Sequence, residues 1–146
     1  MRKGFWLVLL LVVGFMLYLE PFRGAPPEPD VSITGTKIDV TSGSYCWNGL
    51  LISQCADTVY STPLEMTEKQ TPTVVKPGTI IEVAFNDGPP PQRTKTEQWW
   101  KDGTNKTVQL KNEQLTAPNK KGLYIYHVYA WWKQGDGNVA FSIRVK

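Results

Sequence analysis

The carboxyl-terminal segment Gly122–Lys146 constrains the fold most strongly, because its pattern predicts two strands joined by a turn. Residues from Leu123 to Trp132 are mostly β-branched or aromatic, as is typical of strands. After Gly135–Gly137, which is the predicted turn, apolar residues alternate with small or polar ones. This period of two predicts a strand with one buried and one solvent-exposed face. An isolated hairpin is only marginally stable in water, so the rest of the chain must supply a second sheet.

Several shorter strands, separated by turn signals, are predicted before this hairpin. Ile81, Val83 and Phe85 alternate with polar or small residues after a Pro77-Gly78 turn, which predicts a strand with one buried face. Prolines exclude Asp87–Pro91 from a strand interior, because proline removes a ladder donor. Short strands at such spacing predict an all-β protein with a β-sandwich. The remaining segments are predicted as strands at Thr73–Lys76, Gln98–Lys101 and Thr107–Leu110, and as a loop at Leu115–Lys121.

Three motifs within residues 72–146 resemble bacterial immunoglobulin-like domains: PGTIIEVAF at Pro77–Phe85, WWKDG at Trp99–Gly103 and PNKKGLYIYHV at Pro118–Val128. The resemblance implies an immunoglobulin-like β-sandwich in which Trp99 is the core tryptophan and Tyr124 lies at a sheet corner. The chain departs from antibody-type domains because both cysteines precede this region, so the usual inter-sheet disulfide is missing. The whole arrangement also resembles small membrane-anchored proteins of Gram-positive bacteria with no assigned activity.

The amino-terminal segment has the pattern of an export signal. Arg2 and Lys3 precede the uncharged apolar run Phe5–Leu19, so residues 1–23 are predicted as a transmembrane or signal-anchor helix with a cytoplasmic amino terminus. At about 1.5 Å per residue the run is shorter than the ~30 Å hydrocarbon core. A cleaved secretory signal is the alternative, although no A-x-A pattern follows the run. Both predictions place the rest of the chain outside the cell, and the first attaches it to the cell membrane through residues 5–19.

Two connecting segments are predicted from their composition and their cap residues. Prolines within residues 24–30 predict an extended linker that holds the domain away from the bilayer. The sequence Thr62–Glu65 places a threonine cap before a proline and a capping-box glutamate, which predicts one helical turn.

Cys46 and Cys55 are the only cysteines of the chain. In an exported protein such a pair predicts one structural disulfide. Asn48-Gly49 lies between them and is a hairpin-turn signal. Residues 31–70 are therefore expected to form a small disulfide-tied β extension, followed by the sandwich in residues 71–146.

Alternation in the carboxyl-terminal hairpin predicts an aromatic face. If Tyr124 points inward, the even-numbered residues up to Trp132 also point inward and the odd-numbered ones point outward. With Trp99 in the core, Trp100 faces outward as well. The alternative is that residues 31–70 cover this face, so that its aromatic residues are core. The candidate binding patch consists of Trp100, His127, Tyr129 and Trp131, with His127 as a strand-surface histidine.

Composition and motifs favour binding over catalysis. Most of the net charge of +3 lies in the first 24 residues, so no nucleic-acid partner is predicted. No hydrolase, zinc-protease or nucleotide-binding fingerprint occurs, and the cysteines with one histidine make a poor ligand set, so no catalytic residue, cofactor or metal is predicted. We expect a non-catalytic, membrane-tethered extracellular β-domain that binds a cell-envelope glycan or protein. The alternative is a secreted protease-inhibitor-like module whose proline-stiffened loop Asn86–Thr96 enters a protease cleft.

Overall fold

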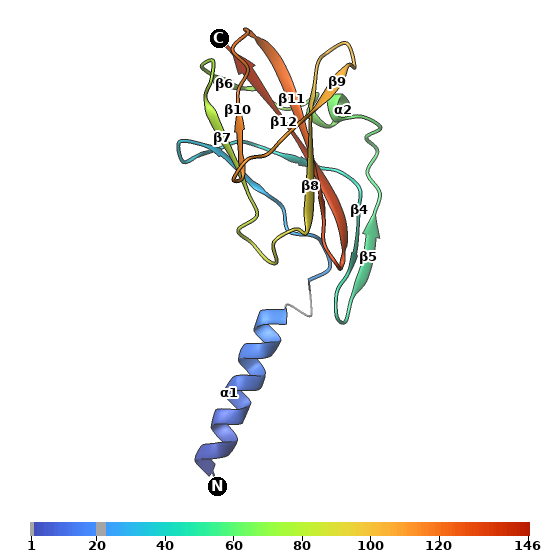
Figure 1. Ribbon diagram of the computed structural model, residues 1–146. Coiled ribbons are helices and arrows are strands. Elements are labelled where there is room, and N and C mark those ends of the chain that lie inside the picture. The colour runs from blue at the N-terminus through green and yellow to red at the C-terminus, as the bar shows by residue number, and fades with distance from the viewer. Residues whose placement is uncertain (1, 20–22) are drawn as a thin grey trace.

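The computed structural model describes residues 2–19 and 23–146 and shows a helix followed by a two-sheet β-domain, which confirms the predicted β-rich class (Figure 1). The strands pair antiparallel, except that β6 runs parallel to β12. The elements are α1 (Arg2–Leu19), β1 (Asp30–Ile33), β2 (Thr36–Lys37), β3 (Thr41–Ser42), β4 (Tyr45–Asn48), β5 (Ser53–Ala56), α2 (Pro63–Thr67), β6 (Thr73–Val75), β7 (Ile80–Ala84), β8 (Arg93–Trp99), β9 (Asn105–Val108), β10 (Gln114–Thr116), β11 (Gly122–Trp131) and β12 (Gly135–Val145).

The two sheets draw their strands from both halves of the chain. The smaller sheet has the order β10-β7-β1-β2, and the larger has the order β5-β4-β12-β11-β8-β9. Strands β3 and β6 also pair with β12. The long hairpin β11–β12 therefore forms the centre of the larger sheet, and residues 31–70 add strands to both sheets (Figure 1).

The core lies between the sheets and consists of the residues that alternation predicts. Ile81 and Val83 of β7 are fully buried, while Glu82 between them is exposed. From the larger sheet, Tyr126 stacks on Phe141 with ring centroids 5.2 Å apart. The inward-facing residues of β11 and β12 in this cluster are Tyr124, Tyr126, Val128, Val139, Phe141, Ile143 and Val145.

The turn of the hairpin lies before the predicted one. The amide of Trp132 donates to the carbonyl oxygen of Gly135 at 2.8 Å, so Lys133 and Gln134 form the turn. Gly135 and Gly137 already belong to β12. Because these glycines have no side chain, Cys46 and Pro26 can approach the strand closely. A Cβ on Gly135 would lie 2.0 Å from the Cys46 carbonyl oxygen, and one on Gly137 would lie 2.7 Å from Cγ of Pro26.

Two further predicted boundaries were wrong. Strand β8 begins at Arg93, well before the predicted Gln98, so Asn86–Thr96 is not a loop throughout. Its residues carry no apolar alternation, and they form a strand because β8 pairs with β11. Leu115, placed in a predicted loop, is buried in β10, which pairs with β7.

The disulfide between Cys46 and Cys55 is confirmed, and it joins directly paired residues of β4 and β5. The loop of this hairpin is longer than an Asn-Gly turn, since the Gly49 amide donates to the Ile52 carbonyl oxygen at 2.7 Å. Capping of α2 is also confirmed: the Glu65 amide donates to the Thr62 hydroxyl at 3.3 Å.

The proline-rich segment 24–30 packs onto the domain instead of forming a free linker. Pro27 and Pro29 are buried, and the segment continues directly into β1. Because proline has no backbone N–H, its burial leaves no donor that needs a partner. Its ring also covers apolar surface well.

Helix α1 occupies the predicted amino-terminal place, and its side chains between Phe5 and Leu17 are exposed. In the ranges 2–19 and 23–146, no helix combines the length and apolar character that crossing a bilayer requires, so the predicted transmembrane span is not found there.

Candidate functional site

The candidate site is the face of the larger sheet that points away from the smaller one, named here the outer face. Cross-strand pairing brings together residues of three neighbouring strands on this face. Each row holds one residue from β8, one from β11 and one from β12. Counted from the end that lies away from α2, the rows are Arg93, Trp131 and Asp136; Lys95, Tyr129 and Asn138; Glu97, His127 and Ala140; and Trp99, Ile125 and Ser142.

Three of the four predicted patch residues meet on the outer face. The His127 and Tyr129 ring centroids are 4.1 Å apart, and Tyr129 stacks on Trp131 at 5.8 Å. Trp100 does not join them, because it packs against the core between the sheets. Trp99 takes its place, since it pairs with Ile125 and shares the face of that residue. The assignment of Trp99 as the core tryptophan was therefore wrong by one residue, which reverses the face in a strand.

Residues 31–70 cover one end of the outer face, so the alternative interpretation holds for that end. Helix α2 packs beside β11 and β12. The Gln70 amide nitrogen donates to the Ala140 carbonyl oxygen at 3.1 Å, and the Ser142 hydroxyl donates to the Gln70 side-chain oxygen at 3.4 Å. Ala140 and Ser142 are buried beneath this cover, whereas Tyr129 and Trp131 remain partly exposed. The outer face thus has a covered end and an open end.

His127 lies at the boundary between the two ends and is buried, in contrast to the predicted surface histidine. Its Nε2 lies 2.8 Å from Oδ1 of Asn138, whose amide nitrogen donates to the Ser44 carbonyl oxygen at 2.8 Å. This second bond orients Asn138 so that an acceptor faces the ring, and His127 therefore carries its proton on Nε2. Nδ1 is buried without a hydrogen-bond partner.

Burial lowers the pKa of His127 below its ordinary value, although the bond to Asn138 opposes this. The ring is therefore neutral at pH 7. Nδ1 is shielded from solvent and Nε2 is bonded to Asn138, so in this arrangement His127 links β11 to β12.

Two cations flank the open end, and neither was predicted from the sequence as part of the patch. The Arg93 guanidinium lies 4.1 Å from the Trp131 ring centroid, and Lys95 lies 5.9 Å from that of Tyr129. The available signal was the alternation R-T-K-T-E-Q-W over residues 93–99, which places every second residue on one face.

Lys95 is also bound to its neighbour on the strand. Its Nζ lies 2.7 Å from Oε1 of Glu97, and this hydrogen bond raises the pKa of Lys95. Burial would raise the pKa of Glu97, but hydrogen bonds from Lys95 and Trp99 hold it below its usual value. Both groups are charged at pH 7, and of the two cations beside the rings Arg93 lies closer to its ring, at 4.1 Å against 5.9 Å for Lys95.

The disulfide borders the open end. Cys46 pairs with Asp136, which in turn pairs with Trp131. Both cysteines are exposed on the outer side of β4 and β5. The bond therefore fixes one edge of the aromatic surface.

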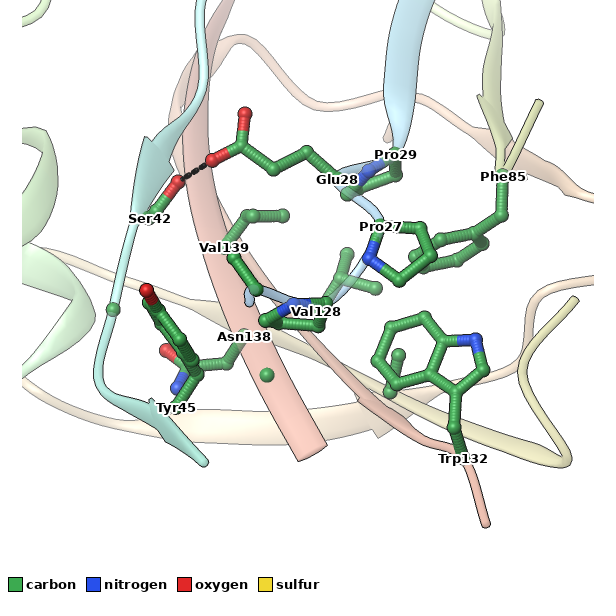
Figure 2. A pocket seen from close by; sticks show the side chains of 15 residues that line it. Pro27, Glu28, Pro29, Ser42, Tyr45, Phe85, Val128, Trp132, Asn138 and Val139 are labelled. Atoms are coloured by element: carbon green, nitrogen blue, oxygen red, sulfur yellow. Dashed lines mark hydrogen bonds between the residues drawn. The ribbon is translucent and has the colours of Figure 1, made fainter. Parts of the chain in front are cut away.

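A small hollow lies on the opposite side of β11 and β12, beneath the proline-rich segment (Figure 2). Pro27, Val128, Val139 and Trp132 enclose a cavity of about 50 Å³, and Glu28 hydrogen-bonds to Ser42 at its rim (Figure 2). Pockets for small-molecule ligands are typically about 300–1,000 Å³. We interpret this cavity as imperfect packing between the segment and the sheets.

In the described parts of the chain, no three His, Cys, Asp or Glu residues are grouped closely enough to hold a metal ion. What the open end offers is a stacked aromatic pair with a guanidinium above it, which is suited to binding flat or ring-shaped groups.

Comparison of the chain with protein-family models, with curated proteins and with solved structures found no match.

Proposed function

We propose that this protein is an exported, non-catalytic binding module of the cell envelope, and that it recognises its ligand through the open end of the outer face. The observation that carries the proposal is the partly exposed stack of Tyr129 on Trp131, with Arg93 above the indole. Exposed aromatic rings on a rigid sheet provide a large contact area at a small loss of conformational freedom.

The ligand class that fits this surface is a glycan or a peptide with a negative charge. The partly exposed rings of Tyr129 and Trp131 supply apolar contact surface for sugar rings or flat peptide groups. Arg93 supplies donors for a carboxylate or phosphate on the same ligand. Asp136 at the far side of Trp131 favours a ligand that carries its charge at one end only.

Export and attachment to the membrane are proposed from the composition of α1. Its residues Phe5–Leu17 are almost all large and apolar, and they are exposed around the helix. A helix that is apolar all round requires an apolar environment, which lipid supplies. We place the β-domain on the outer side of the membrane, and a chain cleaved after α1 would instead be secreted.

An immunoglobulin-like arrangement is proposed for the sandwich. Support comes from β8 beside the hairpin β11–β12, and from the parallel pairing of β6 with β12. The Tyr124 hydroxyl also donates to the Lys120 carbonyl oxygen at 2.8 Å, as a corner tyrosine of such domains does.

Substitution of Trp131 tests the binding proposal. Full-length protein in lipid nanodiscs would be applied to arrays of cell-envelope glycans and peptides. Trp131→Ser is expected to weaken binding by about thirtyfold, since losing an anchoring aromatic costs about 2 kcal/mol. The melting temperature should stay within a few degrees of the parent, because Trp131 lies outside the core.

Ile80→Ser is the matched control, because it removes an exposed apolar side chain from the smaller sheet. It should leave binding unchanged. The binding proposal fails if Trp131→Ser binds like the parent, or if it loses binding only because the whole domain unfolds.

A further inference from the structure

The tip of the β4–β5 hairpin exposes a run of three apolar residues. Leu50, Leu51 and Ile52 have exposed fractions of 67%, 66% and 41%. Consecutive exposed apolar side chains on a water-facing loop are unfavourable unless something covers them. In the described ranges nothing does so, which points to a partner outside the chain.

The tip is held rigidly by the contacts below it. The Cys46–Cys55 disulfide joins the two strands, and Trp47 is buried against Trp132 with ring centroids 5.6 Å apart. The Asn48 amide donates to the Gln134 carbonyl oxygen at 2.8 Å. The three side chains are thus presented in one fixed place, so little conformational entropy is lost when they are covered.

The tip also lies beside Arg23 and Gly24, which follow α1 in the chain. A Cβ on Gly49 would be 2.6 Å from the Arg23 carbonyl oxygen, and one on Gly24 would be 3.6 Å from Cγ2 of Ile52. The backbone of Arg23 and Gly24 therefore passes directly along the hairpin loop. Since α1 ends at Leu19, the chain from Leu19 to Arg23 spans at most about 15 Å.

From this juxtaposition we propose that Leu50, Leu51 and Ile52 insert into the lipid bilayer beside α1, as a second membrane contact that orients the β-domain. The inference rests on the membrane attachment proposed above. The headgroup region is roughly 5–8 Å thick on each side. The short connection to α1, at most about 15 Å, keeps the tip near enough to the bilayer to enter this region when the domain leans towards it. Lys133 in the adjacent β11–β12 turn is exposed and suits anionic headgroups.

This orientation narrows the class of ligands that the outer face can reach. With the hairpin tip in lipid, the disulfide and the open end beside it stand close to the membrane surface. The ligands within reach of Tyr129 and Trp131 are then those in the innermost layer of the envelope. Glycans or peptides attached to lipid headgroups belong to this class.

Depth measurement with a spin label tests the insertion. Full-length Leu51→Cys protein would carry a nitroxide in vesicles of phosphatidylcholine and phosphatidylglycerol in equal parts. The native cysteines stay bonded, so the label reacts with the new thiol only. We expect collisions with oxygen to exceed collisions with a water-soluble nickel complex severalfold. Leu50→Cys gives an independent second reading.

Val59→Cys is the matched control, because Val59 is apolar and 91% exposed but follows β5 at the end away from the tip. Its label should report water. If positions 51 and 59 report the same accessibility while the protein remains on the vesicles, insertion is refuted and attachment by α1 stands. Spin–spin broadening at position 51 would assign the tip to a second copy and also refute the proposal. A protein that does not sediment with vesicles at all would refute the attachment itself.

Discussion

At the scale of single residues, the outer face depends on hydrogen bonds that fix side-chain orientation. Asn138 bridges β11 and the chain before β4, because it faces His127 through its oxygen and Ser44 through its nitrogen. The neutral imidazole then supports the Tyr129 ring at 4.1 Å. The partly exposed stack is therefore positioned by polar groups that lie next to it in the sheet.

The buried histidine makes stability depend on pH. The pKa of His127 is lowered in the folded state from an ordinary value of 6.5, so the unfolded chain binds its proton first as the pH falls. Stability should therefore decrease below about pH 6.5, by at most about 1.4 kcal/mol per pH unit, until the folded pKa is reached. Glu97 opposes this shift and Lys95 adds to it.

Urea unfolding at neutral pH and at roughly pH 5.5 measures this effect. His127 is the only histidine, so His127→Gln should remove this component of the pH dependence while leaving that of the carboxyl groups. Equal pH slopes for the parent and the variant would show that His127 does not titrate on unfolding.

At the scale of elements, β12 is the strand on which the rest is assembled. It pairs with β11 along its whole length and with β4, β3 and β6 on its other edge. The approach of β4 requires a glycine at position 135, because any Cβ there would collide with the Cys46 carbonyl oxygen. This glycine joins the disulfide hairpin to the sandwich.

Gly135→Ala should detach β4 from β12. The expected loss of stability is about 2–3 kcal/mol, as for other overpacked sites. Hydrogen exchange of the Asn48 amide should become faster, since its bond to Gln134 is broken, while the Val83 amide in β7 stays protected. Asp136→Ala, at the exposed neighbouring position, is the control. Unchanged protection of Asn48 would contradict the role given to Gly135.

At the scale of the whole molecule, the two sheets share one core and neither half of the chain forms a sheet alone. Val31 from the amino-terminal half and Phe141 from the last strand are both fully buried in the same cluster. The smaller sheet places β1 next to β7, so strands far apart in sequence depend on one another. Such a molecule is expected to unfold as a unit.

Phe141→Ala tests this dependence. Removing the ring that stacks on Tyr126 should cost about 3–5 kcal/mol, while unfolding remains a single transition. Tryptophan fluorescence and circular dichroism would be followed together in urea. Ile80→Ala removes an exposed side chain and should change stability by less than about 1 kcal/mol. Two separated transitions would show that the sheets fold independently.

Local patterns were sufficient to predict the features that depend on neighbours in the chain. The hairpin β11–β12, the buried alternation of β7 and the cap of α2 follow from residues a few positions apart. The disulfide was predictable because there are only two cysteines to join. In each case the physical cause lies within the segment itself.

Features that depend on distant neighbours were decided by the tertiary structure. Trp99 and Trp100 are equally apolar, and only the register of β8 on β11 selects which one faces the core. Likewise, Gly135 suits a turn as well as a close approach, and only the position of β4 distinguishes the two. His127 is buried because residues 31–70 fold over one end of its face. Alternation along a strand defines two faces, but the neighbouring strands and the segments packed on them determine which face becomes the core and how much of the other stays open.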